Sequence, residues 1–325
     1  MQRGMRYQLL GPLTVSHENR PIRLGGPRQQ ILLAMLLLEA NQVMDLDRLI
    51  DAIWSEQPPT SAKTQIRICV SEIRRRFLEA GCGESIETHS SGYLLRVENE
   101  ALDLRQFKQF VARGRQAARD GHDEEAMRLL KAALALWRGP MFSGLNSTLL
   151  DAAAVRFDEE RQVVIEEYVD LCLALGMHRE IVGELAGYVA DAPFQENLCA
   201  QYMWTLHRCG RKAEALEFFR YVRRRFADEL GIEPSRNLRR AETRILTDES
   251  GGEPVSSITY VRTPDRHVGV EDRLSRLEQE LEQLRSEYSQ LVGRSRAQAG
   301  GERALSHSRQ PIFHRYPTGI AERDH

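Results

Sequence analysis

Lysine, paired cysteine and long apolar runs are all scarce in this chain of 325 residues. Only four of its 45 basic residues are lysines, a bias typical of GC-rich coding rather than of a biochemical need. The five cysteines form no CxxC pair, which excludes a dithiol motif and predicts reduced, mostly buried thiols. The longest apolar run, Ile31–Leu38, has eight residues and is too short to span a bilayer. Because no signal-peptide pattern is present either, we expect a cytoplasmic, nucleoid-associated protein without a membrane partner.

Side chains suited to catalysis or metal binding also form no recognisable pattern. The nine histidines are scattered, and none belongs to a HExxH motif or to a Cys/His set with ligand spacing. The segment Gly25-Gly26-Pro27 lacks the Lys-Ser/Thr pair of a phosphate-binding loop. The sequence therefore predicts no enzyme, no cofactor and no bound metal.

An excess of positive charge is missing as well, since the net charge is -2. The first 100 residues carry 12 basic and 12 acidic side chains, so that region is neutral overall. Its charges are nevertheless segregated, because Asp45, Asp47 and Asp51 precede a segment in which cations dominate. Nucleic-acid binding depends on such local concentrations of charge, so the overall balance does not exclude it.

The most informative segment is an amphipathic helix that is predicted to follow Pro58-Pro59, which stops the preceding helix. At 100° per residue, one stripe of this helix is apolar and should face a core. The stripe contains Ala62, Ile66, Cys69, Val70, Ile73 and Phe77. The opposite side is rich in cations and hydroxyls, which is the composition of a helix that reads the major groove. The alternative is an ordinary solvated arginine face.

The neighbouring segments favour groove reading. Helical patterns precede the amphipathic helix at Arg28–Ala40 and Leu46–Ser55, and short apolar strands follow it at Ser85–Thr88 and Tyr93–Val97. Three further strands with turn residues between them are predicted at Tyr7–Leu10, Leu13–Val15 and Ile22–Leu24. A small sheet, three helices and a hairpin in this order predict a winged helix-turn-helix.

This arrangement assigns a role to each polar residue of the predicted interface. Thr64, Arg67 and Ser71 should reach base edges, and Ile68 should contact a thymine methyl group. The residues expected beside phosphates are Lys63, Arg74 and Arg75. The residues expected to add minor-groove or backbone contacts from the wing are His89, Ser90 and Ser91.

From Leu102 to Leu246 the pattern is helical and repetitive. Gly121, Gly176 and Gly210 each begin a similar stretch, and the last two lie 34 residues apart, the period of tetratricopeptide helix pairs. The first two lie 55 residues apart, so the repeat needs an insertion, which Trp137–Ser147 supplies. A generic helical bundle is the alternative. Stacked helix pairs would form a concave surface suited to protein contacts.

The tail beyond Leu246 is predicted to be a linker and a disordered segment that flank one short coiled coil at about residues 270–292. Its seam continues from Val270 through Leu274, Leu277, Leu281, Leu284, Tyr288 and Leu291. With Leu274 at position a, Arg273 faces Glu278 of a parallel partner and Glu280 faces Arg285, which favours a parallel homodimer. Folding back on the helical domain is the alternative.

Several motifs in order resemble those of the Streptomyces antibiotic regulatory proteins, over about residues 5–246. They are Leu9-Leu10-Gly11-Pro12-Leu13, Leu24-Gly25-Gly26-Pro27-Arg28-Gln29, Asp47-Arg48-Leu49-Ile50-Asp51-Ala52-Ile53-Trp54, Gly92-Tyr93-Leu94-Leu95, Trp137-Arg138-Gly139-Pro140 and Asp228-Glu229-Leu230-Gly231-Ile232-Glu233-Pro234. The resemblance implies an OmpR-type winged helix (1–100), a bacterial transcriptional activation domain (101–246) and a tail (247–325) to which nothing transfers. The expected fold is mainly α with small β elements.

By this resemblance, the protein is expected to activate transcription of an antibiotic biosynthetic gene cluster. It would bind double-stranded promoter DNA at direct repeats near the -35 region and contact RNA polymerase holoenzyme. Two other functions are considered from the residues, namely a tetratricopeptide-type scaffold and a ligand-gated repressor. The cationic face argues against the scaffold, and the lack of a polar cluster for a ligand argues against the repressor.

Overall fold

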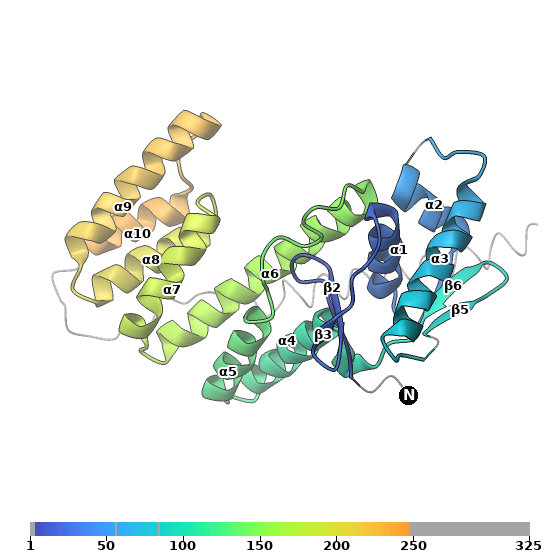
Figure 1. Cartoon of the computed structure of the whole chain (residues 1–325). Helices are drawn as coiled ribbons and strands as arrows, with labels where there is room; N and C mark the ends of the chain where they lie inside the picture. The colour runs from blue at the N-terminus through green and yellow to red at the C-terminus, as the bar shows by residue number, and fades with distance from the viewer. Residues whose placement is uncertain (1–3, 56, 84, 248–325) are drawn as a thin grey trace, which may run out of the picture. The chain divides into compact units, whose positions relative to one another are not determined.

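A computed structural model of the chain describes residues 4–55, 57–83 and 85–247. The predicted coiled coil at 270–292 and the rest of the tail from residue 248 lie outside these residues. The described residues are mainly helical with two small sheets, which confirms the predicted fold class (Figure 1). No helix among them is long and apolar enough to cross a membrane.

The first sheet is antiparallel, with strands in the order β1 (Met5–Gln8), β2 (Thr14–His17) and β3 (Arg20–Pro21). We predicted the first strand at Tyr7–Leu10, but it ends at Gln8. The reason is that Leu9 and Leu10 are both fully buried, and their backbone N–H groups donate to the carboxylate of Asp103. The third strand likewise precedes the predicted Ile22–Leu24.

The winged helix-turn-helix follows in the predicted order. Its elements are α1 (Pro27–Leu38), β4 (Val43–Asp45), α2 (Leu46–Trp54), α3 (Ala62–Glu79), β5 (Ile86–Thr88) and β6 (Gly92–Leu95). Pro27 stands at the start of α1, where its missing N–H costs nothing. The second sheet has the order β4-β6-β5, so β5 is an outer strand. Our sequence reading missed β4, which is three residues long.

The helical region consists of α4 (Asp103–Arg119), α5 (Asp123–Leu134), α6 (Thr148–Ala174), α7 (His178–Asp191), α8 (Glu196–Arg208), α9 (Lys212–Arg225) and α10 (Arg236–Thr247). The helices pack as the pairs α4–α5, α6–α7 and α8–α9. Gly121, Gly176 and Gly210 lie in the turns inside the pairs, each at a positive φ of 76–79° that favours glycine. The predicted rhythm of helix pairs is therefore confirmed, and the insertion lies between α5 and α6.

The insertion at 137–147 packs against the winged domain. The N–H of Arg138 donates to Leu10 O at 2.8 Å, and the N–H of Phe142 donates to Gly11 O at 3.0 Å. At its end, Ser147 Oγ donates to Ala52 O of α2 at 2.7 Å. These bonds join segments more than 90 residues apart in the chain. The insertion is thus one of the elements that connect the first helix pair to the winged domain.

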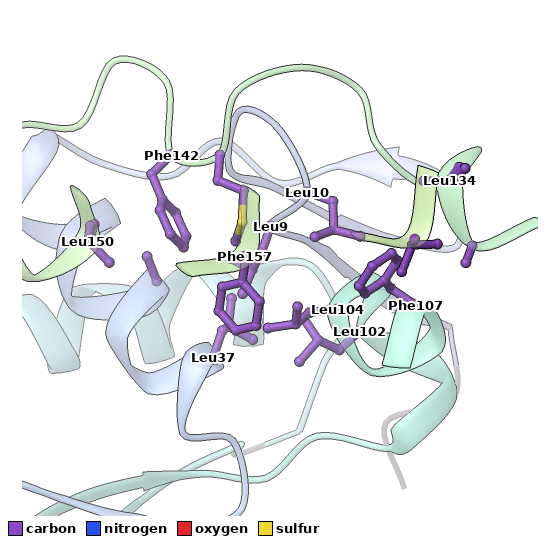
Figure 2. Packing of buried hydrophobic residues seen from close by; sticks show 14 of the residues in the cluster. Leu9, Leu10, Leu37, Leu102, Leu104, Phe107, Leu134, Phe142, Leu150 and Phe157 are labelled. Atoms are coloured by element: carbon purple, nitrogen blue, oxygen red, sulfur yellow. The ribbon is translucent and has the colours of Figure 1, made fainter. Parts of the chain in front are cut away.

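Buried apolar side chains form one continuous cluster through residues 5–245. Figure 2 shows its centre, where side chains from both predicted domains meet. The labelled residues are Leu9, Leu10, Leu37, Leu102, Leu104, Phe107, Leu134, Phe142, Leu150 and Phe157. Separating the two domains would expose these side chains to water, which is the main reason that they stay together.

Asp103, the first residue of α4, supports this junction from inside. Its side chain is buried, and its carboxylate accepts the N–H groups of Leu9, Leu10 and Leu104 at 2.8–3.0 Å. Burial raises the pKa of the Asp103 carboxyl, although these N–H donors and nearby Arg138 act in the opposite direction. One carboxylate therefore accepts the hydrogen bonds of the backbone N–H groups both where β1 ends and where α4 begins.

A second acid, Asp170 of α6, is held in a less favourable environment. Gln201 Nε2 donates to its Oδ1 at 2.6 Å, while Glu166 and Glu167 lie nearby. Burial, and then these two carboxylates, raise the pKa of Asp170 to about 6 from its usual 3.8, against the effect of the Gln201 hydrogen bond. At neutral pH the charged carboxylate therefore opposes folding.

Replacing Asp170 with Asn should stabilise the protein in a pH-dependent way. Because the pKa of Asp170 is raised in the folded state, its favourable contribution to the free energy of unfolding is present below about pH 4. That contribution is lost as the pH rises through about 6. The gain in the unfolding free energy of Asp170→Asn should grow over this window to about 1–3 kcal/mol at pH 8. Urea unfolding measures it, with Asp158→Asn on the exposed side of α6 as control. A gain that is the same at every pH would contradict the assignment.

Candidate nucleic-acid interface

The helix α3 presents two faces, as its periodicity predicts. Every member of the apolar stripe is buried, and Ile66 and Ile73 are fully covered. The exposed residues on the other face are Lys63, Thr64, Arg67, Ile68, Ser71 and Arg75. Burial of one side against the core therefore holds six of the predicted contact residues toward solvent. Arg74, the seventh predicted contact residue of this helix, is only partly exposed, and its guanidinium donates hydrogen bonds to β5.

Arg67 and Ile68 occupy the middle of the exposed face. Within the described part of the chain, Arg67 makes no hydrogen bond or ion pair, so its guanidinium is available to a ligand. Ile68 is 56% exposed although it is a large apolar residue, a cost that contact with a thymine methyl group would remove. A free cationic fork beside an exposed methyl-bearing side chain suits a base pair in the major groove.

Arg75 is also exposed but is already paired with carboxylates of its own helix. It contacts Glu72 at 2.7 Å and Glu79 at 2.5 Å, one turn away on either side. Arg75 in turn lowers the pKa of Glu72, chiefly through its hydrogen bond. A phosphate bound by Arg75 would have to replace these carboxylates, which weakens the contact that the sequence predicts.

Arg74 points to the wing. Its Nε and Nη2 donate to Ile86 O at 3.1 and 2.7 Å, and Nη2 also donates to Thr88 Oγ1 at 2.9 Å. The sequence reading placed Arg74 beside phosphates because Arg74 lies at the edge of the cationic face of the predicted helix. The bond to a backbone carbonyl twelve residues away leaves no signal in the helical periodicity.

The wing turn, His89 to Ser91, is exposed, as a groove-entering loop must be. His89 N donates to Gly92 O and closes the turn, while Leu46 N donates to Ser91 O at 2.9 Å and ties it to α2. Gly92 is required here because a Cβ would lie 1.9 Å from Met44 O of β4. Glu87 lies 3.4 Å from the His89 ring and pairs with Arg96, so the wing carries an acid close to its tip.

Two family models match this architecture. Residues 19–95 match the family described as transcriptional regulatory protein, C terminal, which corresponds to the winged helix. Residues 102–246 match the bacterial transcriptional activator domain, which corresponds to α4–α10. The two matches meet near the short 3-10 helix at Asn99–Ala101.

Curated and solved relatives agree with these matches. Regulatory protein AfsR of Streptomyces coelicolor is 34% identical over 257 residues, which cover 79% of this chain but only 26% of AfsR. Regulatory protein DnrI of Streptomyces peucetius is 31% identical over 255 residues, which cover 76% of this chain and 94% of DnrI. The structure of Mycobacterium tuberculosis EmbR in complex with low affinity phosphopeptide is similar, with a TM-score of 0.69 and 31% identity over 74% of this chain and 65% of that chain. The chain belongs to the Streptomyces antibiotic regulatory protein family of transcriptional regulators.

Proposed function

We propose that this chain is a sequence-specific DNA-binding transcriptional activator of a secondary-metabolite gene cluster. The observation that carries the proposal is the exposed face of α3, where Arg67 is unpaired beside Ile68 on a helix fixed by its buried side. Thr64, Arg67 and Ser71 would contact base edges, and Lys63 would contact a phosphate. The wing would contribute less, because Ser90 and Ser91 at its tip are neutral and carry no cation for the narrow groove.

The helical repeats would carry the activating function. We infer that residues 101–246 contact RNA polymerase holoenzyme while residues 1–100 occupy direct repeats near the -35 region. The match of residues 102–246 to the bacterial transcriptional activator domain supports this division. A scaffold that has lost DNA binding would not need the cationic face of α3.

Transcription in vitro with the cognate polymerase holoenzyme tests this function. The template should carry sites that the wild-type protein selects from a random duplex pool. We expect the protein to shift the selected duplex and to raise transcript yield, whereas the double variant Lys63→Ala/Arg67→Ala should do neither. A selected duplex whose transcription falls on binding would indicate the repressor, and a pool from which no sequence is enriched would indicate the scaffold.

We also propose that the tail makes a homodimer through the heptad seam of Leu274, Leu277, Leu281, Leu284, Tyr288 and Leu291. Direct repeats require head-to-tail DNA-binding domains, whereas a parallel coiled coil has two-fold symmetry. The segment 251–269 between them is long enough to reconcile the two symmetries.

Removal of the tail should therefore separate dimerisation from recognition. A chain ending at Leu246, or Leu281→Pro in the full chain, should lose self-association and bind a two-site duplex about 100-fold less tightly. Affinity for a single site should stay unchanged. Analytical ultracentrifugation and titration of both duplexes measure these quantities. A truncated chain that remains a dimer would place the interface in the helical repeats.

A further inference from the structure

One side chain makes the hydrogen bonds between the recognition helix and the wing. Among the described residues, Arg74 makes all the hydrogen bonds that join α3 to the β5–β6 hairpin. One carbonyl, Ile86 O, accepts both Nε–H and Nη2–H, and Thr88 Oγ1 accepts the second Nη2–H. Figure 1 shows α3 beside this hairpin.

The position of Ile86 in the sheet explains why its carbonyl is available. Ser85 O accepts Arg96 N, and His89 bonds with Gly92 in the same sheet, so residues 85 and 89 face β6. Successive residues of a strand direct their backbone N–H and C=O groups to opposite sides. The backbone groups of Ile86 and Thr88 therefore face the open edge of β5. Since β5 is the outer strand of its sheet, no other strand in the part of the chain that the structure describes covers that edge. Arg74 supplies the donors that a neighbouring strand would otherwise give.

Only arginine can make this connection from that place on the helix. Its planar guanidinium directs two parallel N–H groups at one oxygen and a third at the hydroxyl beside it. A lysine ammonium is a compact point charge that cannot span the same acceptors. Two of the three nitrogen atoms, Nε and Nη2, are thus committed to the wing before any ligand arrives.

We propose that Arg74 is a positioning residue for DNA recognition, which fixes the wing against α3 so that helix and hairpin reach adjacent grooves together. This inference rests on the proposed DNA-binding function. It differs from the role predicted from the sequence, in which Arg74 contacts a phosphate. Arg75, the next residue, provides the contrast, because its partners are the side chains of Glu72 and Glu79 on its own helix and not a backbone carbonyl of the hairpin.

The salt dependence of binding distinguishes positioning from a phosphate contact. For a duplex that the wild-type protein selects, Arg74→Gln should lower single-site affinity on the order of tenfold without changing the slope of log K against log salt. Arg74→Lys should lose about as much, since charge alone does not restore the geometry. A phosphate contact predicts the opposite, namely that Lys retains affinity and that Gln reduces the slope by about 0.9. That pair of results would overturn the proposal.

A second measurement does not involve DNA. Amide hydrogen exchange in the free, folded protein should become faster at residues 86–92 in Arg74→Gln and in Arg74→Lys. Arg75→Ala, the matched control, should leave these amides unchanged. Unchanged exchange in the Arg74 variants would also overturn the proposal. If the wing amides respond as expected but no duplex is selected, Arg74 still fixes the wing against α3, and it is the proposed DNA-binding function that fails.

Discussion

Asp103→Ala should lower the free energy of unfolding by about 3–5 kcal/mol, because each buried N–H left without an acceptor costs about 1–3 kcal/mol. Three such groups, on Leu9, Leu10 and Leu104, depend on this carboxylate. The loss would remove a large fraction of the stability of a typical domain. Urea unfolding followed by circular dichroism measures it.

The control for this variant is Asp151→Ala, since Asp151 is an exposed acid in the first turn of α6. It should lose less than about 1 kcal/mol, the usual contribution of a first-turn acid. The amides of Leu9 and Leu10 give a local reading, because their protection from hydrogen exchange should fall in Asp103→Ala alone. A loss no larger than that of Asp151→Ala would show that the junction does not depend on Asp103.

Arg67→Ala should weaken binding to a selected duplex by about 1–3 kcal/mol and relax the preference at one base position. The expected effect is large because Arg67 is unpaired in the free protein and gives up no internal ion pair when it binds. Arg75→Ala should instead weaken all sequences alike, since the role predicted for Arg75 is a phosphate contact. Competition against single-base variants of the duplex measures the preference. If Arg67→Ala weakens every variant equally, Arg67 contacts the backbone and not a base.

Features with a local cause could be predicted from the sequence. The buried stripe of α3 follows from apolar spacing alone, and all six predicted residues are buried. The glycine turns inside the helix pairs follow equally directly, because a positive φ is costly for other residues. The predicted break in the repeat at Trp137–Ser147 was visible for the same reason, since glycine and proline interrupt helices there.

Features that depend on distant partners could not be predicted. The bonds of Arg138 and Phe142 to Leu10 and Gly11 are made by backbone groups, which carry no information about side-chain type. Asp103 looks like an ordinary acid at a helix start until the N–H groups of Leu9 and Leu10 are placed beside it. The same holds for β4, since three residues are too few for an alternation to be recognised.

The junction at residues 103 and 137–147 has a consequence for promoters. If the first helix pair is fixed to the winged domain, docking of α3 in the groove also fixes the side of the double helix on which that helix pair lies. DNA makes one turn in about 10.5 base pairs, so an operator moved by half a turn would carry the activator domain to the opposite side of the promoter. A move by a whole turn would return it to the same side. With the proposed docking of α3, a few backbone hydrogen bonds would thus restrict operators to positions that differ by whole helical turns.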